Sequence, residues 1–208
     1  MSVKDQIPPD GVHHYASADE VPFEISKYWH QRHQIFSKFD DGIWLTDDAW
    51  FGVTPEPVAN KVAEHMASAP KSKTILIDAF GGAGGNVIAF ARSGRWKQIF
   101  AVERDPKVLA CAKHNAEIYG VANKIWWIEG DVFTQLNKQL KTVKKNATVL
   151  FASPPWGGKC LVHRVLQLVL GSVVDLQYQG QHTQTTKYTI WATCNRTHLR
   201  SSTLPLQA

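Results

Sequence analysis

Hydrophobic residues gather in four short runs between residues 73 and 152, with a longer stretch of mixed character between each run and the next. The runs are rich in Ile, Val and Phe, which is typical of buried strands. They cover residues 73–78, 98–102, 124–129 and 147–152. The stretches between them, about 86–93, 107–119 and 133–140, are expected to be helices. This alternation predicts a parallel, doubly wound α/β sheet.

The chain before residue 67 has a different pattern. Residues 1–25 mix prolines with acidic and small polar residues and show little periodicity, so they are expected to form a flexible leader. Residues 26–66 are rich in aromatic side chains at helix-like spacing, and Thr54-Pro55 favours the start of a helix at 57–66. Two interpretations are open for this segment: a small satellite core, or an aromatic lid over a ligand site.

Composition narrows the class of protein. At 208 residues, with 44% hydrophobic and 20% charged residues, the chain fits one globular domain. It has no apolar run of membrane-spanning length and no signal-peptide core. Its three widely spaced cysteines are expected to be reduced thiols in an intracellular protein and argue against structural zinc. Residues 159–208 contribute +4 of the net charge of +5, so the charge alone does not indicate RNA binding.

The turn after the first strand is rich in glycine, with four glycines between Gly81 and Gly85. Such a turn lets backbone amides approach a ligand at the N-terminus of the next helix. The Gly-Lys-Ser/Thr of a phosphate-binding loop is absent, and Val87 stands where a dinucleotide fold has its third glycine. The turn therefore favours a ligand other than these two.

Acidic residues at the strand ends indicate which ligand. Asp78 can accept hydrogen bonds from the ammonium of an amino acid, whose carboxylate the glycine amides can bind. Glu103, at the end of the second strand, is placed to hold a ribose diol. Asp131, after the third strand, is placed to accept from an adenine amine. The ligand that joins these three groups is S-adenosylmethionine.

The fourth strand leads into Ser153-Pro154-Pro155-Trp156-Gly157-Gly158. The two prolines make this turn stiff and place carbonyls, a hydroxyl and an indole ring beside one another. One interpretation is a simple strand-terminating turn with a core tryptophan. The other is a grip for a planar base with an exocyclic amine, since open α/β sheets bind ligands at the carboxyl ends of their strands.

With these motifs together, the chain resembles the amino-methylating class I methyltransferases, and among them the trimethylguanosine synthase family. The resemblance covers about residues 24–158. Its motifs are K-Y-W-x-Q-R at 27–32, F-S-x-F-D-D-G-I at 36–43, W-F-x-V-T-P-E at 50–56, D-A-F-G-G-x-G-G-N at 78–86, N-A-E-x-Y-G at 115–120 and S-P-P-W-G-G at 153–158. It implies a Rossmann-like fold and S-adenosylmethionine-dependent methylation of N2 in the 7-methylguanosine cap of small nuclear and nucleolar RNAs. It also implies no metal and no membrane, with localisation in nucleus and cytoplasm.

The resemblance also implies residue roles. Trp156 would stack on the cationic 7-methylguanine ring, while Ser153 and the Pro154 carbonyl would orient N2. Phe36 and Thr54 match positions near the bound substrates, which favours the lid interpretation. His30 and His33 are interpreted as surface residues. The full set of residues expected to bind the cofactor is Asp78, Phe80, Gly82, Gly84, Asn86, Glu103, Asp131, Phe36 and Thr54.

After Gly158 the resemblance ends. The expected division is a leader at 1–25, a lid or substrate segment at 26–66, a truncated methyltransferase core at 67–158 and a divergent tail at 159–208. The tail shows no clear strand pair, so the last strands are expected to be missing or replaced, leaving the fourth strand as a poorly covered edge. Two rival functions stay open: methylation of another exocyclic amine in RNA or DNA, and an inactive truncated isoform.

Overall fold

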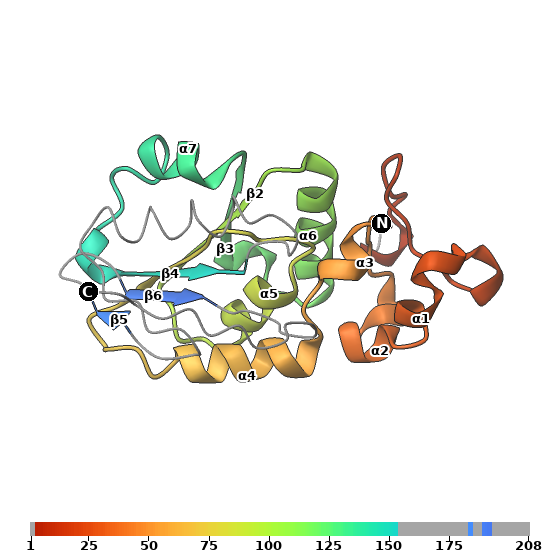
Figure 1. The fold of residues 1–208 in the computed structure, drawn as a ribbon, viewed down its shortest axis with the longest axis horizontal. Coiled ribbons are helices and arrows are strands. Elements are labelled where there is room, and N and C mark those ends of the chain that lie inside the picture. The colour runs from red at the N-terminus through yellow and green to blue at the C-terminus, as the bar shows by residue number, and fades with distance from the viewer. Residues whose placement is uncertain (1–2, 154–182, 185–188, 193–208) are drawn as a thin grey trace, which may run out of the picture.

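A β-sheet forms the centre of the fold, and helices pack against its two faces (Figure 1). The computed structural model describes residues 3–153, 183–184 and 189–192. Within these residues the strand order is β3-β2-β1-β4-β6-β5. The strands are β1 (Ile75–Asp78), β2 (Gln98–Glu103), β3 (Ile125–Glu129), β4 (Thr148–Ala152), β5 (Thr183–Gln184) and β6 (Thr189–Ala192). All pairings are parallel except that of β5 with β6. The predicted doubly wound α/β sheet is confirmed.

The main helices lie close to their predicted positions. They are α4 (Glu56–Met66), α5 (Gly85–Arg92), α6 (Pro106–Ile118) and α7 (Val132–Asn137). Side-chain caps fix two of the starts: Asp105 accepts from the amide of Lys107 at 2.8 Å, and Asp131 from that of Thr134 at 3.1 Å. No helix among the described residues is long and apolar enough to cross a membrane.

Alternate residues of each strand enter two separate cores, as the period of a strand requires. On one face, Leu76, Val149 and Phe151 pack with α4, α5, α6 and the N-terminal segment. On the other face, Ile77 and Leu150 pack with α7 and the loop that follows it. The sheet is therefore buried on both faces, which is the usual condition of a parallel sheet.

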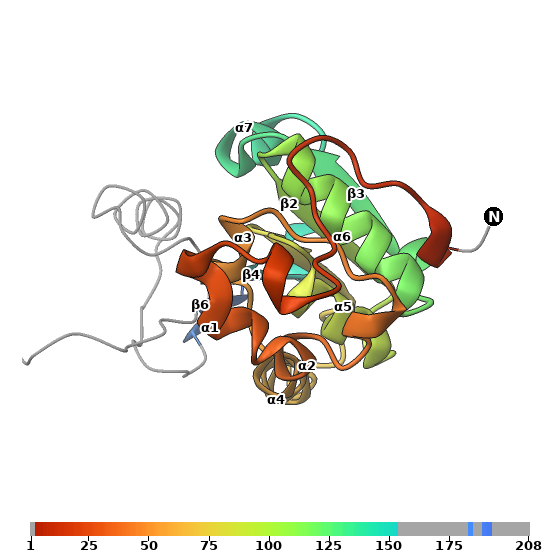
Figure 2. The same cartoon turned by 90° about the vertical axis from the view of Figure 1, so that its right-hand side faces the viewer.

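The aromatic N-terminal segment lies across the carboxyl end of the sheet (Figure 2). It contains the short helices α1 (Ser26–Trp29), α2 (Arg32–Ile35) and α3 (Ala49–Gly52) rather than one long helix. Its buried rings belong to the same core as Phe90 and Phe151 of the sheet layer, so the satellite-core interpretation is wrong. Those rings are Trp29, Phe36, Phe39, Trp44 and Trp50.

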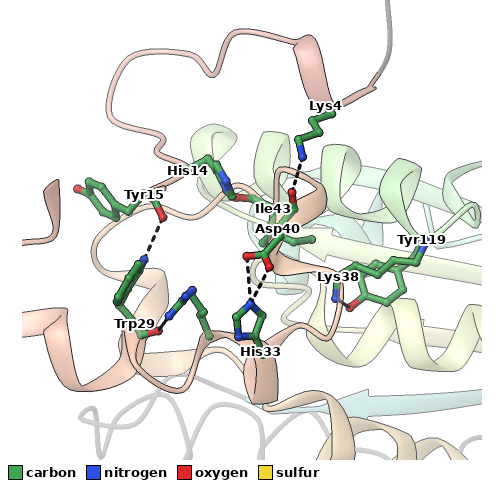
Figure 3. Close-up of polar contacts among 10 residues, drawn as sticks. Lys4, His14, Tyr15, Trp29, His33, Lys38, Asp40, Ile43 and Tyr119 are labelled. Atoms are coloured by element: carbon green, nitrogen blue, oxygen red, sulfur yellow. Dashed lines mark hydrogen bonds and ion pairs between the residues drawn. The ribbon is translucent and has the colours of Figure 1, made fainter. Parts of the chain in front are cut away.

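Part of the segment expected to be a flexible leader is packed instead. Val12 is 3% exposed and Tyr15 is 9% exposed. His13 forms a backbone bridge with Leu45, and the indole of Trp29 donates to the carbonyl of Tyr15 at 2.9 Å (Figure 3). These contacts depend on partners about 15 to 30 residues away, which local sequence patterns do not reveal.

The tail also differs from expectation. Residues 189–192 pair with β4 in parallel, Val149 opposite Thr189, and β5 adds a further antiparallel strand. The expectation that the tail lacks a strand pair and leaves β4 as an edge is therefore wrong. The segment Leu161–Val174, for which a helix or strand was expected, lies outside the described residues.

Candidate functional site

A cavity of about 460 Å³ opens at the carboxyl ends of the parallel strands, where ligands of open α/β sheets bind. Four strand-end loops and the end of the N-terminal segment meet around it. The cavity is lined by three groups of residues. After the first two strands these are 79–83, Gly85, Asn86, Val102, Glu103, Arg104 and Val108; after the next two they are 130–132 and Ser153. The N-terminal segment contributes Asp48, Ala49 and 52–54.

The glycine turn after β1 forms the floor of this cavity. Gly82 and Gly84 have positive φ angles of 53° and 101°, which disfavour other residues. Gly85 is required for a different reason, since a Cβ atom there would lie 2.8 Å from the Thr54 carbonyl oxygen. The turn thus brings the first amides of α5 close to both the cavity and the N-terminal segment.

Asp78 lies at the end of β1 and is fully buried. Its Oδ1 accepts from the amide of Phe80 at 3.2 Å, while its Oδ2 has no hydrogen-bond partner among the described residues. Burial, together with repulsion from Glu103, raises the pKa of Asp78 to about 7. A buried carboxylate oxygen without a donor is costly, and a cationic ligand group would satisfy it.

Glu103 and Asp131 are held in the cavity wall by backbone amides. Glu103 accepts from the amides of Gly82 and Asp105, both at 2.9 Å, so it joins the glycine turn to the start of α6. Asp131 uses Oδ1 to cap α7 through Thr134. In both residues the carboxylate is fixed at the cavity, with acceptor capacity left for a ligand.

The N-terminal segment supplies the opposite wall through Thr54. The Asn86 side-chain amide donates to the Thr54 hydroxyl at 3.0 Å, and the Asn86 Oδ1 atom has no partner within the described part of the chain. After Asp78 Oδ2, it is the second buried oxygen of the site that lacks a hydrogen-bond donor among the described residues. The segment therefore completes the cavity.

Most of the residues expected to bind the cofactor come together here. Thr54, Phe80, Gly82, Asn86, Glu103 and Asp131 line the cavity, and Asp78 and Gly84 lie in the strand and turn that shape it. Phe36 does not line it; this ring is 2% exposed and packs near Tyr119. Ser153 reaches the cavity wall, whereas Pro154 and Trp156 lie outside the described residues.

Sequence reasoning missed several residues of the site. Asp48 and Arg104 line the cavity, although no motif marked Asp48, and at the end of β2 only Glu103, the residue before Arg104, was expected to contribute. Asn115, fully buried in α6, exchanges two hydrogen bonds with the backbone of Trp44 and donates to the Ala83 carbonyl at 3.0 Å. The motif at 115–120 marked this asparagine, but only the fold reveals that it ties the N-terminal segment to the glycine turn.

The charges and free acceptors suit S-adenosylmethionine, which carries a sulfonium and an ammonium. Three carboxylates against one guanidinium line the cavity, from Asp48, Glu103, Asp131 and Arg104, and the carboxyl of Asp78 lies beneath. Such a site attracts cations and disfavours a pyrophosphate. Within the described ranges no cluster of His, Cys, Asp or Glu could hold a metal ion.

Residues 73–167 match the model of a family described as RNA cap guanine-N2 methyltransferase. This stretch of the chain is similar to that family. The trimethylguanosine synthase of Schizosaccharomyces pombe is 42% identical over 139 residues, which are 66% of this chain and 56% of that protein. The enzyme of the same name from Saccharomyces cerevisiae is 36% identical over 136 residues, 65% of this chain and 42% of that protein.

The chain thus spans about half the length of the two trimethylguanosine synthases that it matches. Among solved structures, a putative methyltransferase from Porphyromonas gingivalis superposes with a TM-score of 0.50 at 15% identity, covering 69% of this chain and 38% of that one. This likeness supports the fold. The expected resemblance to the trimethylguanosine synthase family is confirmed.

Proposed function

We propose that this chain transfers a methyl group from S-adenosylmethionine to the exocyclic N2 of an RNA 7-methylguanosine cap, towards the 2,2,7-trimethyl form. The observation that carries the proposal is the acid-lined cavity, where Asp78 keeps an unpaired buried oxygen and whose wall reaches Ser153. Ser153 begins the Ser-Pro-Pro-Trp motif of the amine methyltransferases. The site therefore combines a cofactor cavity with an amine-binding turn.

When bound, the cofactor supplies an electrophilic methyl carbon on a sulfonium. Asp78 would accept from its ammonium, and the amides of the glycine turn would bind its carboxylate. Glu103 would accept from the ribose hydroxyls, and Asp131 from the adenine amine. Thr54 and Asn86 close the cavity from the side of the N-terminal segment.

Ser153 and the Pro154 carbonyl would accept from the N2 amine and orient it toward the methyl group, while Trp156 would stack on the cationic base. The bound cofactor would supply the methyl group to N2, with the C–S electron pair staying on sulfur, and N2 would release a proton to water. Positioning supplies most of the acceleration, and no nucleophilic side chain is required. The substrates we propose are small nuclear and nucleolar RNAs, and the locations nucleus and cytoplasm.

Methyl transfer to 7-methylguanosine triphosphate tests this function directly. We expect labelled methyl from S-adenosylmethionine to appear on N2 of this analogue and not on guanosine triphosphate, because only the methylated base is cationic. Equal transfer to both would favour methylation of another exocyclic amine. Cofactor binding without any transfer would show this chain to be an inactive isoform and would overturn the proposal.

Replacement of the stacking ring tests the role of Trp156. Trp156→Ala is expected to weaken binding of 7-methylguanosine triphosphate by about tenfold or more, at unchanged S-adenosylmethionine affinity. Phe23→Ala, which removes a ring that is 91% exposed, serves as the control and is expected to change neither. Unchanged cap binding in Trp156→Ala would exclude the stacking role.

A further inference from the structure

The amino ends of the parallel strands carry a row of exposed lysines, at the end of the sheet opposite the cavity. Lys97 and Lys124 stand immediately before β2 and β3, and Lys71 and Lys144 lie four residues before β1 and β4. We call this set the basic edge; with two further exposed lysines after α7 it comprises Lys71, Lys97, Lys124, Lys138, Lys141 and Lys144.

Backbone pairing brings these residues together although they are spread over 74 positions of the chain. The amide of Thr74 donates to the Ala147 carbonyl at 2.9 Å, and the amide of Lys97 donates to the Thr74 carbonyl at 2.9 Å. The register then places Ile99 beside Ile125. With strands about 4.8 Å apart, the four strand starts span roughly 15 Å. In Figure 1 strand β4 runs from this edge toward the N-terminal segment.

The described loops that carry the basic edge have no acidic side chain to balance its positive charge. The loops 67–74, 93–97, 119–124 and 138–147 contain no Asp or Glu. On the adjoining helix ends, Glu64 is paired with Lys61 at 2.8 Å, and Glu117 lies near Gln6. Helix C-termini also reach this edge, but their partial charge acts within the last turn, and Lys138, the C-cap of α7, is the one lysine of the basic edge that adjoins the end of a described α-helix.

One exposed ring near the basic edge strengthens the case for a nucleic acid. Trp126, two residues after Lys124, is 58% exposed, and it is the one large exposed hydrophobic side chain near the basic edge among the described residues. Lysine side chains bind the phosphates of a nucleic acid, and an exposed indole ring stacks on a base. A protein partner would instead require a buried apolar core in the interface, which the described part of this edge does not offer.

We propose that the basic edge binds the phosphodiester backbone of the substrate RNA beyond its cap. The proposal builds on the proposed function, which places the cap at the opposite end of the sheet. The sheet is about 17 Å long between the two ends, so an RNA chain must extend along the domain to contact both. A cap analogue without an RNA chain would contact the cavity end alone.

The test compares two matched double variants of the full chain. Lys97→Gln with Lys144→Gln removes two charges from the basic edge; Lys61→Gln with Lys113→Gln removes two from the outer faces of α4 and α6. Binding of a capped RNA of about 20 nucleotides is measured by fluorescence anisotropy across a salt series. We expect the first pair to weaken binding about five- to tenfold and to reduce the salt slope by about 1.4, and the second pair to change neither.

Two further measurements separate the alternatives. Methyl transfer to 7-methylguanosine triphosphate reports the proposed function alone, and the basic-edge variant is expected to keep it. Equal RNA affinity of the two double variants would overturn the inference. So would loss of binding to an acidic peptide, measured in the same assay, while RNA binding stays intact, since the edge would then be a protein-binding surface.

Discussion

The carboxyl group of Asp78 shows how one buried residue can link the stability of the fold to pH. Its folded pKa of about 7 lies above the usual 3.8, because burial disfavours the charged form. Between these two values the native protein holds a proton that the unfolded chain has released. The cofactor-free protein therefore loses stability as the pH rises from about 4 to about 7.

The variant Asp78→Asn tests both the pH dependence of stability and the affinity for the cofactor. We expect the variant to lose this pH-dependent slope in the cofactor-free protein, and to bind S-adenosylmethionine about 30-fold or more weakly, a loss of about 2 kcal/mol, because the partner of the ammonium is gone. Thermal melts from pH 4 to pH 7 and calorimetric titration measure the two effects. Asp19→Asn, at an exposed position, should match the unsubstituted protein in both, and retained affinity in Asp78→Asn would contradict the role.

At the scale of elements, Glu56 joins four parts of the chain. At the start of α4, it accepts from the amide of Ser37 at 2.7 Å, from the Tyr119 hydroxyl at 2.6 Å and from the Arg92 guanidinium at 2.6 Å. Burial alone would raise its pKa, but these three donors outweigh burial and lower the pKa to about 2. The carboxylate holds the N-terminal segment against α5 and the end of α6, two residues from Thr54 of the cavity wall.

Glu56→Gln is expected to lower the free energy of unfolding by about 1–3 kcal/mol at pH 7, because the charged acceptor is lost. A carboxyl with a depressed pKa stabilises the fold above its unfolded value of 4.5, and this stability is lost as the pH falls toward 2. The difference between the two proteins should therefore shrink at pH 3. Urea unfolding at both pH values measures it.

Glu64→Gln is the matched control for this experiment. Glu64 lies on the same helix but pairs with Lys61 on the exposed surface, where ion pairs contribute little. We expect its urea midpoint to stay close to that of the unsubstituted protein. A Glu56→Gln variant that behaves like this control would show that the network does not hold the segment in place.

At the scale of the whole molecule, the tail completes the sheet. Strand β6 lies between β4 and β5, so its backbone donates and accepts within the ladder. Ile190→Pro removes one donor from this central position and should lower the free energy of unfolding by about 1–3 kcal/mol. It should also speed amide exchange in β4. Gln184→Pro, on edge strand β5, should cost less, since an edge tolerates proline; unaltered exchange of β4 in Ile190→Pro would contradict the pairing.

The distribution of charged side chains is also a property of the whole molecule. Residues 1–158 carry a net charge of only +1, which predicted little about nucleic acids. The fold separates the signs, with carboxylates around the cavity and lysines at the other end of the strands. A sum over the sequence cannot show such a separation, because it depends on which loops the sheet places at each edge.

The sequence by itself determined the features that neighbouring residues encode. Strand and helix periodicity predicted β1 to β4 and α4 to α7 within a few residues, and the glycine turn with Asp78, Glu103 and Asp131 located the cavity. These predictions succeed because a parallel sheet brings the carboxyl ends of its strands to one edge, whatever lies between them.

Only the tertiary structure decided the features that depend on distant partners. Three contacts join segments between 14 and 71 residues apart. They are the hydrogen bond from Trp29 to Tyr15, the hydrogen bonds between Asn115 and Trp44, and the pairing of β6 with β4. The tertiary structure also brings lysines that are far apart in the sequence together at the basic edge. Periodicity reports which side of an element is buried, but the choice of what covers that side is made by the whole packed core.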